Sequence, residues 1–207
     1  MEPLVREMWK DFYFDPAGAD ADARVTEAAA RVRETAEYLK AAGVEEKEPA
    51  PARLKEAFRA VDEAHVIQLM PPKDQKVMGG NAAVRDKVAP EEYRLVFVTN
   101  QYRVLVGKPA LRLNPKLCAA ARDHCKDMIE RKFFAHDSPV PGKRTPGDRA
   151  ALQGASASGE NIAMGNREPE PTFWQWFGSL GHHRNMLGDY TEIGVGRHEA
   201  HWTEMFS

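Results

Sequence analysis

The most constraining feature of this chain is an ordered series of short motifs between Phe133 and Phe206. They combine histidine, glutamate, glycine and aromatic residues, and they follow one another as FFAHDSP, SGENIA, WFGSLGHHRNML, YTEIGVG and HWTEMF. No single motif decides a function. Because histidine and glutamate recur among small and aromatic residues, we expect the series to form the wall of one polar cleft.

The bulk composition is typical of a soluble globular protein, and the length suits one domain with an extension or two small domains. The 207 residues include 29 Lys and Arg and 31 Asp and Glu, a formal net charge of -2. Such a balance supplies no general field that attracts nucleic acid. The longest apolar stretches are far shorter than the roughly 20 residues of a membrane-spanning helix. We therefore predict no nucleic-acid partner, no membrane span and only local binding.

Two features bear on the cellular compartment. The first residues, MEPLVREMWKDF, lack the basic and apolar regions of a secretory signal, which predicts either an intracellular protein or part of a longer exported chain. Cys118 and Cys125 are predicted on one helix, about 10 Å apart, which exceeds the roughly 7 Å that a disulfide spans. We interpret both as buried thiols that neither require nor exclude an oxidising compartment.

The first ninety residues are expected to be helical. Residues 22–42 show apolar residues at helical spacing, and a second helix is expected after Pro51. PPKDQKVMGGN, residues 71–81, is interpreted as a linker, because tandem proline ends a helix and paired glycine frees the backbone. The composition changes near Pro90. We therefore predict a helical N-terminal region over residues 1–90 and a second domain over residues 91–207.

The second part is predicted to mix helices, loops and strands. Asn114 as N-cap and Pro115 at the first helical position predict a helix that runs to about Lys132. Shorter helices are expected at residues 147–153, 172–180 and 182–187, and strands at residues 191–197 and 201–206.

Three polar residues of the series are predicted to meet. His136 follows the end of the long helix, where the helix dipole alone is an alternative reason for a histidine. Glu160 follows Gly159, so we expect it to leave a tight turn toward the interior, where a carboxylate needs a partner. A histidine is the natural partner at neutral pH, and His182 supplies a second one.

The segment around His182 reads WxxSxGHxxNxL. We expect Asn185 to tie down the loop through its amide, and we expect His183 to face solvent, because successive residues cannot both point into one cleft. The further cleft candidates are Ser179, Asn185 and His201, the last facing either the cleft or the core.

Several familiar chemistries have no motif in this chain. HExxH, the phosphate-binding P-loop and GxGxxG are absent, so zincin, nucleotide and hydride-transfer functions have no support. Asp137 and Ser138 next to His136 do not make a serine-hydrolase triad, since sequence neighbours seldom point at each other and a GxSxG elbow is absent.

Taken together, the motifs resemble the CAP or SCP superfamily of cysteine-rich secretory proteins, antigen 5 and pathogenesis-related proteins, and most of all its bacterial branch. The match begins near NQYR at residues 100–103 and covers just over half of the chain. It continues, in family order, through LRLNPKLCAAARDHCKDM, FFAHDSP, RTPGDRA, GENIA, WFGSLGHHRNML, EIGVG and HWTEMF.

That resemblance implies an α+β fold: a three-layer α-β-α sandwich with a largely antiparallel central sheet, here preceded by the helical N-terminal region. Members of the family are generally exported, which implies an extracellular or cell-envelope location and a chain that is part of a longer protein. The eukaryotic members are rich in disulfides and this chain is not, which is typical of the bacterial branch.

The resemblance also implies a cleft that the family builds from two histidines and two glutamates, which in some members hold a divalent metal such as zinc. Carried over, the first histidine is His136, the first glutamate Glu160 and the second histidine His182. The second glutamate has no clear counterpart, since Glu168 and Glu170 lie too early in the sequence.

Three functions follow as expectations. The first is binding of an unidentified ligand, metal or protein partner in the cleft without turnover. The second is a metal-dependent peptidase or esterase, in which His136 and His182 hold zinc and Glu160 acts as general base. The third is lipid or sterol binding by the apolar surface of Phe173, Trp174 and Trp176, for which core packing is the favoured alternative.

Overall fold

A computed structural model describes residues 63–207 of the chain. Residues Pro71–Ser207 form one compact unit, which carries the whole motif series. The helices expected at residues 22–42 and after Pro51 lie outside the described residues. The domain boundary near residue 90 stays a prediction, whereas helix α4 (Pro72–Ala83) belongs to the same compact unit as the motifs.

A four-stranded sheet with the order β1-β3-β4-β2 forms the centre of the second unit. Strands β2 (Gly159–Met164), β4 (His201–Phe206) and β3 (Glu192–His198) pair antiparallel, and the short β1 (Arg112–Leu113) pairs parallel with β3. The two strands expected near the end of the chain are confirmed. Strand β2 was missed because five of its six residues are buried, so it lacks alternating polarity.

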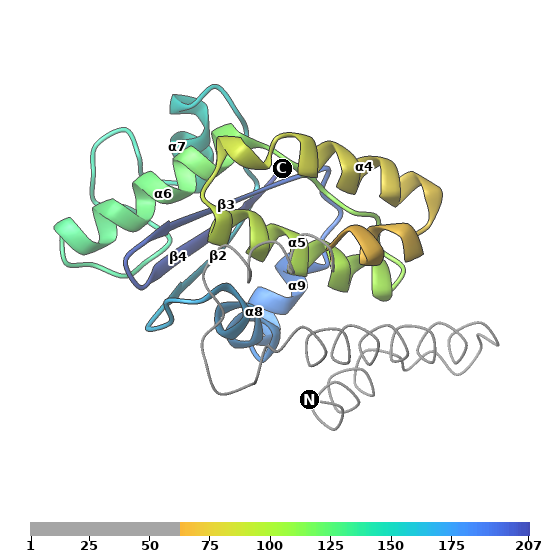
Figure 1. Cartoon of the computed structure of the whole chain (residues 1–207). Coiled ribbons are helices and arrows are strands. Elements are labelled where there is room, and N and C mark those ends of the chain that lie inside the picture. Colours follow the sequence, from red (N-terminus) through yellow and green to blue (C-terminus); the bar gives the residue numbers. More distant parts are fainter. Residues whose placement is uncertain (1–62) are drawn as a thin grey trace, which may run out of the picture. The chain divides into compact units, whose positions relative to one another are not determined.

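Helices cover both faces of the sheet (Figure 1). Helix α6 (Pro115–Glu130) packs on β3 and β4, with α7 (Pro146–Leu152) beside it. Helix α5 (Pro90–Leu105) contacts β3 on the other side, while α8 (Pro169–Phe177) and α9 (Leu180–Met186) contact β2. These layers confirm the three-layer α-β-α sandwich with a largely antiparallel sheet.

Two glycines of β3 set the distance between the sheet and α6. A Cβ atom at Gly194 would collide with the backbone around Leu117, and one at Gly196 would collide with the backbone at Ala121 and Arg122. On β4, Met205 pairs with Gly194 and Thr203 pairs with Gly196, while Glu160 of β2 pairs with Met205. Directly paired residues of an antiparallel sheet point to the same face, so Met205, Thr203 and Glu160 also point toward α6. Asn161 and Glu204, one residue along each strand, point to the opposite face.

The segment interpreted as a linker is helix α4, which begins after Pro71. The prediction was wrong because Pro72 occupies the first helical position, where a missing N–H costs nothing. The buried amide of Asn81 donates to the carbonyl of Leu111 (2.9 Å) and accepts from the N–H of Leu113 (2.7 Å). These tertiary hydrogen bonds offset the low helix propensity of the glycine pair at residues 79–80.

The long helix α6 forms as the sequence predicts. The side chain of Asn114 caps it by accepting from the backbone N–H of Lys116 (2.9 Å), and Pro115 is its first residue. Cys118 and Cys125 lie buried and unpaired on this helix, and burial raises the pKa of each thiol to about 12. Among residues 63–207, no helix has the length and apolar character needed to cross a membrane.

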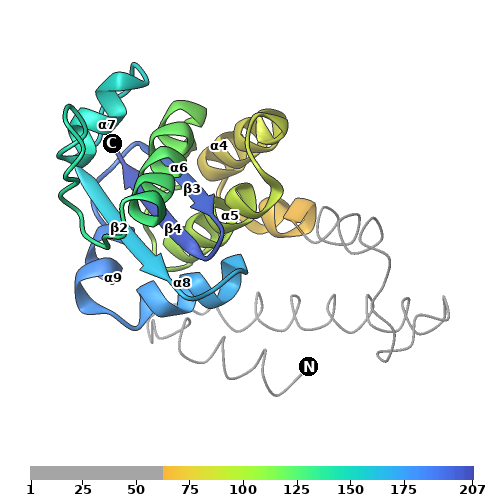
Figure 2. The ribbon, with the colours of Figure 1, turned by 90° about the vertical axis from the view of Figure 1, so that its left-hand side faces the viewer.

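Strand β2 lies at the edge of the sheet, beside α8 and α9 (Figure 2). Side chains from these helices occupy two of its backbone carbonyls. Asn185 donates to the carbonyl of Glu160 (2.9 Å), and the indole of Trp176 donates to the carbonyl of Ile162 (3.1 Å). The two helices therefore take the place of a further strand along this edge.

Candidate binding site

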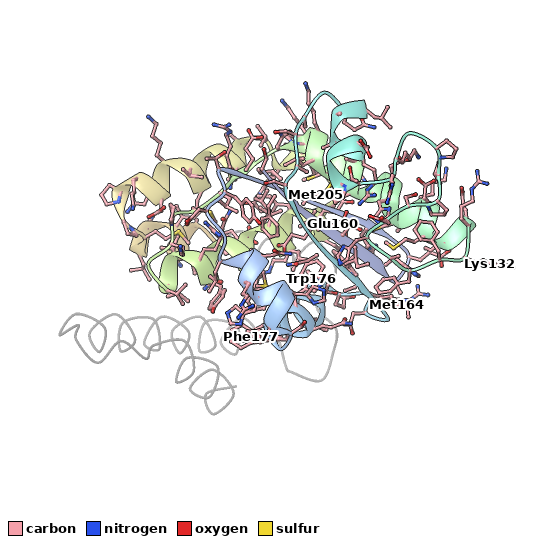
Figure 3. All side chains as sticks on the ribbon, turned by 180° about the vertical axis from the view of Figure 1, so that it is seen from behind. Lys132, Glu160, Met164, Trp176, Phe177 and Met205 are labelled. Carbon is pink, nitrogen blue, oxygen red and sulfur yellow. The ribbon has the colours of Figure 1, made fainter. Side chains whose placement is uncertain are left out.

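Glu160 is the centre of the candidate site. It is the second residue of β2, so it does not leave a tight turn as the sequence predicts. Its side chain is buried, and its predicted direction toward the interior is therefore correct. One carboxylate oxygen accepts from Nη2 of Arg149 (2.5 Å) and the other from Nδ1 of His136 (2.9 Å). Figure 3 shows Glu160 at one end of β2 and Met164 at the other.

Arg149 of α7 organises the loop that carries His136. Its fully buried guanidinium donates through Nη1 to the carbonyls of His136 (3.1 Å), Lys143 (2.9 Å) and Arg144 (3.0 Å). Through Nη2 it holds Glu160. A buried charge needs such partners, so one side chain fixes both the loop and the carboxylate. Arg149 was not among the predicted site residues, although RTPGDRA is one of the motifs that match the family.

His136 is the accessible member of the pair, with 52% of its side chain exposed. Its hydrogen bond to Glu160 raises the pKa of the imidazole above its ordinary value, against the opposing effect of partial burial. Because the Glu160 carboxylate accepts at Nδ1, that nitrogen carries the proton and Nε2 is the atom left for a ligand.

His182 lies on α9 in a different environment. Its Nδ1 is buried without a hydrogen-bond partner among the described residues, and its backbone carbonyl accepts from Asn161 (3.1 Å). Burial, followed by the charge of His136, lowers the pKa of His182. The charge of His136 therefore acts on His182, and the pKa of His136 is raised while that of His182 is lowered.

Asn185 holds α9 against β2. Its amide donates to the carbonyl of Glu160 (2.9 Å) and to Oδ1 of Asn161 (3.0 Å). It is therefore a positioning residue on the side of the site that carries His182.

The remaining two candidates do not join Glu160. Ser179 precedes α9 and makes no side-chain cap hydrogen bond there. His201 pairs with Met164, four residues along β2 from Glu160, which is about 13 Å at 3.3 Å per residue. Its ring packs edge-on against Phe134, with 6.0 Å between the ring centroids.

His183 does not simply face solvent. Its Nε2 lies 2.5 Å from the hydroxyl of Tyr102, and its ring packs on Phe177 with 4.7 Å between centroids. The prediction was wrong because a helical residue that points away from the site meets the neighbouring helices α5 and α8 instead of water. His183 therefore anchors α9 to the domain.

The residues present do not fit a catalytic zinc ion. Such a site usually has three protein ligands, but within residues 63–207 no three His, Cys, Asp or Glu side chains are placed to hold a metal. Both oxygens of Glu160 are already engaged, which leaves the two imidazoles. Glu170, considered as a second glutamate, instead pairs with Arg94 (2.8 Å).

A histidine of α6 that the sequence predicts only as a core or boundary residue also lies near the site. His124 of α6 is fully buried, and its Nε2 lies 4.0 Å from Oε1 of Glu160. Burial lowers the pKa of His124 to about 4, so it stays neutral behind the site. Its Nε2 is also 3.1 Å from the carbonyl of Ala135, beside His136.

The fold and this His/Glu cluster define a CAP-type domain. The family model described as CAP, the cysteine-rich secretory protein family, matches residues 96–204. The chain belongs to this family, and its similarities to Bacillus proteins place it in the bacterial branch.

Three relatives illustrate the match. The chain is 31% identical over 173 residues to the protein YkwD of Bacillus subtilis, an alignment that covers 81% of this chain and 66% of that protein. An extracellular protein of Bacillus anthracis with an SCP domain shares 30% identity and a TM-score of 0.53 over 56% of this chain and 39% of its own. An outer surface protein of Borrelia burgdorferi shares 19% identity and a TM-score of 0.48 over 55% of this chain and 88% of its own. The chain thus spans less than two thirds of the two Bacillus proteins.

Proposed function

We propose that this domain binds a ligand bearing a carboxylate through His136 and His182, without turnover. The observation that carries the proposal is the engagement of Glu160. Its two oxygens accept from Arg149 and His136. A general base must be within reach of water or substrate, but the side chain of Glu160 is 2% exposed and that of His136 is 52% exposed. This geometry favours a scaffold role for Glu160.

The charges of the two histidines support the choice of ligand. Glu160 raises the pKa of His136 and thereby favours its cationic form, while burial lowers the pKa of His182 and favours its neutral form. A carboxylate at this position would accept a charge-assisted hydrogen bond from Nε2 of His136. His182 would then contribute a neutral imidazole next to that contact.

Peptide binding tests this proposal. A fluorescent tetraglutamate peptide should bind saturably, and more tightly below the raised pKa of His136 than above it, because the imidazole is cationic only below that pKa. A tetraglutamine peptide should not bind. The substitution His136→Ala should abolish binding, whereas His198→Ala, at the far end of β3, should leave it unchanged. Equal binding by wild type and His136→Ala would contradict the proposal, as would cleavage of the peptide.

The two alternatives from the sequence have weaker support. For a zinc hydrolase, residues 63–207 place no third ligand with the two histidines, and the carboxylate of Glu160 is buried against Arg149 and His136. A lipid groove would use aromatic side chains, but Phe173 and Trp176 are buried in the core, with exposed fractions of 1% and 0%. Trp174 is partly buried and packs edge-on against Phe173 and Phe177. Metal analysis of the purified protein and organic extraction of bound lipid would each reveal the corresponding function directly.

The location outside the cytoplasm is also part of the proposal. Its support is the family membership and the similarity to the Bacillus anthracis protein that is described as extracellular. Fractionation of cells that express the full-length natural protein, followed by immunoblotting, tests it. The proposal predicts the protein in the envelope or medium fraction, and its retention in the cytoplasm would contradict it.

A further inference from the structure

A chain of buried polar side chains runs through the core behind the site. It begins at Glu204 of β4, which is fully buried on the face of the sheet opposite α6. One oxygen of its carboxyl group accepts from the hydroxyl of Thr99 on α5 (2.8 Å). The other accepts from the amide of Asn161 on β2 (3.0 Å). Glu204 therefore joins α5 to the strand that carries Glu160.

Asn161 passes this connection on to α9. Its Nδ2 donates to the carbonyl of His182 (3.1 Å) as well as to Glu204, and its Oδ1 accepts from Asn185 (3.0 Å). Asn185 in turn donates to the backbone carbonyl of Glu160. The orientation of one buried amide thus determines whether α9 is tied to the sheet at two points.

The ionisation state of Glu204 selects that orientation. An ionised carboxylate only accepts, so it requires Asn161 to present its N–H groups. A protonated carboxyl group has a donor on one oxygen. If this donor faces Asn161, the amide must present its oxygen instead, which takes Nδ2 away from His182 and Oδ1 away from Asn185.

The surroundings of Glu204 place its ionisation near neutral pH. Burial raises its pKa to about 7, against the hydrogen bonds from Thr99 and Asn161 and the charge of Arg103. Arg103 lies on α5, and its guanidinium donates through Nε and Nη1 to the backbone carbonyls of Pro109, Met186 and Gly188. Its buried Nη2 has no hydrogen-bond partner among the described residues. On β3, the residue paired with Glu204 is the apolar Val195.

We propose that Glu204 is a proton-linked positioning residue: when ionised it fixes Asn161, and through it α9 with His182, and when protonated it releases this connection. The effect on ligand binding rests on the function proposed above. The effect on the hydrogen bonds between Asn161 and α9 does not, because it follows from the donors and acceptors of the two buried side chains.

NMR titration of the full chain, followed at side chains of residues 63–207, tests the proposal. In wild type, the carboxyl carbon of Glu204 and the side-chain amides of Asn161 and Asn185 should share one inflection between pH 5 and 9. The isosteric substitution Glu204→Gln should remove this inflection from both amides. The substitution His136→Ala should keep it, which separates it from the titration of His136.

Two results would overturn the proposal. One is a Glu204 carboxyl carbon that does not titrate in this range in wild type, a measurement that needs no variant to fold. The other is amide signals of Asn161 and Asn185 whose inflection disappears in His136→Ala and persists in Glu204→Gln. If the shared inflection is present but tetraglutamate does not bind at any pH, the function proposed above fails and the role of Glu204 stands.

Discussion

Arg149 and Glu160 form a fully buried ion pair, with 2.5 Å between Nη2 and Oε2, and the same guanidinium holds three backbone carbonyls of the loop that carries His136. A surface salt bridge contributes little to stability, but removal of one partner of a buried pair leaves an uncompensated charge. The structure of the site and the stability of the domain therefore both depend on this ion pair.

The substitution Arg149→Ala should lower the free energy of unfolding by about 3–5 kcal/mol, because Glu160 would remain buried without its cation. Urea unfolding at pH 7 measures this. Arg144→Ala, which removes the exposed pair with Asp137, is the matched control and should change stability by less than about 0.5 kcal/mol. Similar losses in both variants would contradict the structural role of Arg149.

The titration of His136 should depend on Glu160. In Glu160→Gln the imidazole loses its hydrogen bond to a charged carboxylate, which raises its pKa, so its pKa should fall toward the ordinary value. A histidine with a raised pKa in the folded state stabilises the fold below its unfolded pKa, and this contribution disappears as pH rises through the folded pKa. NMR titration of the His136 ring measures the shift. An unchanged pKa of His136 would contradict the geometry.

Stability should also respond to the proton on Glu204. Its folded pKa of about 7 lies above the ordinary 4.5, so the folded state binds the proton more tightly and the free energy of unfolding falls as pH rises from 4.5 to 7. The difference corresponds to about 3 kcal/mol. In Glu204→Gln this fall should be absent, and in the control Glu130→Gln, at an exposed position of α6, it should persist. Urea unfolding at pH 5 and pH 8 gives the comparison.

Two glycine substitutions should have opposite effects on stability, because Gly196 lies against α6 and Gly80 has open space around it. Gly196→Ala should destabilise by at least about 1–3 kcal/mol, because the new Cβ meets the α6 backbone rather than a flexible side chain. Gly80→Ala, within α4 and with no atom near the added Cβ, should stabilise by up to about 1 kcal/mol. Thermal unfolding of both variants tests the prediction, which would fail if Gly196→Ala were neutral.

The two cysteines should be unreactive in the folded protein. Burial holds the pKa of both thiols at about 12, and the thiolate is the reactive form. A thiol reagent at pH 8 should therefore modify neither Cys118 nor Cys125 until urea unfolds the chain. Rapid modification of either residue in native buffer would show that α6 opens more readily than its packing indicates.

Local signals in the sequence predicted the elements that depend on local physics. Asn114 and Pro115 specify the start of α6 through a cap and a fixed dihedral, and neither needs a distant partner. The same logic failed at Pro71 and Pro72. There, the hydrogen bonds of Asn81 to a segment thirty residues away decide that a helix forms.

The site was predictable only in part, for a related reason. His136 and Glu160 stood out because polar residues follow one another in a recognisable order. Arg149 and Glu204 did not, because a charged residue is ordinarily expected at the surface. Their roles depend on burial and on partners that only the folded chain brings together.

The carbonyls of β2 that Asn185 and Trp176 occupy have a consequence for the solubility of the domain. An uncovered strand edge presents unpaired backbone groups on which another chain can add a strand. Side chains of α8 and α9 donate to backbone carbonyls of this edge. Partial detachment of α9 would therefore expose an unpaired strand edge as well as displace His182. The residues that shape the site thus also protect the domain from aggregation.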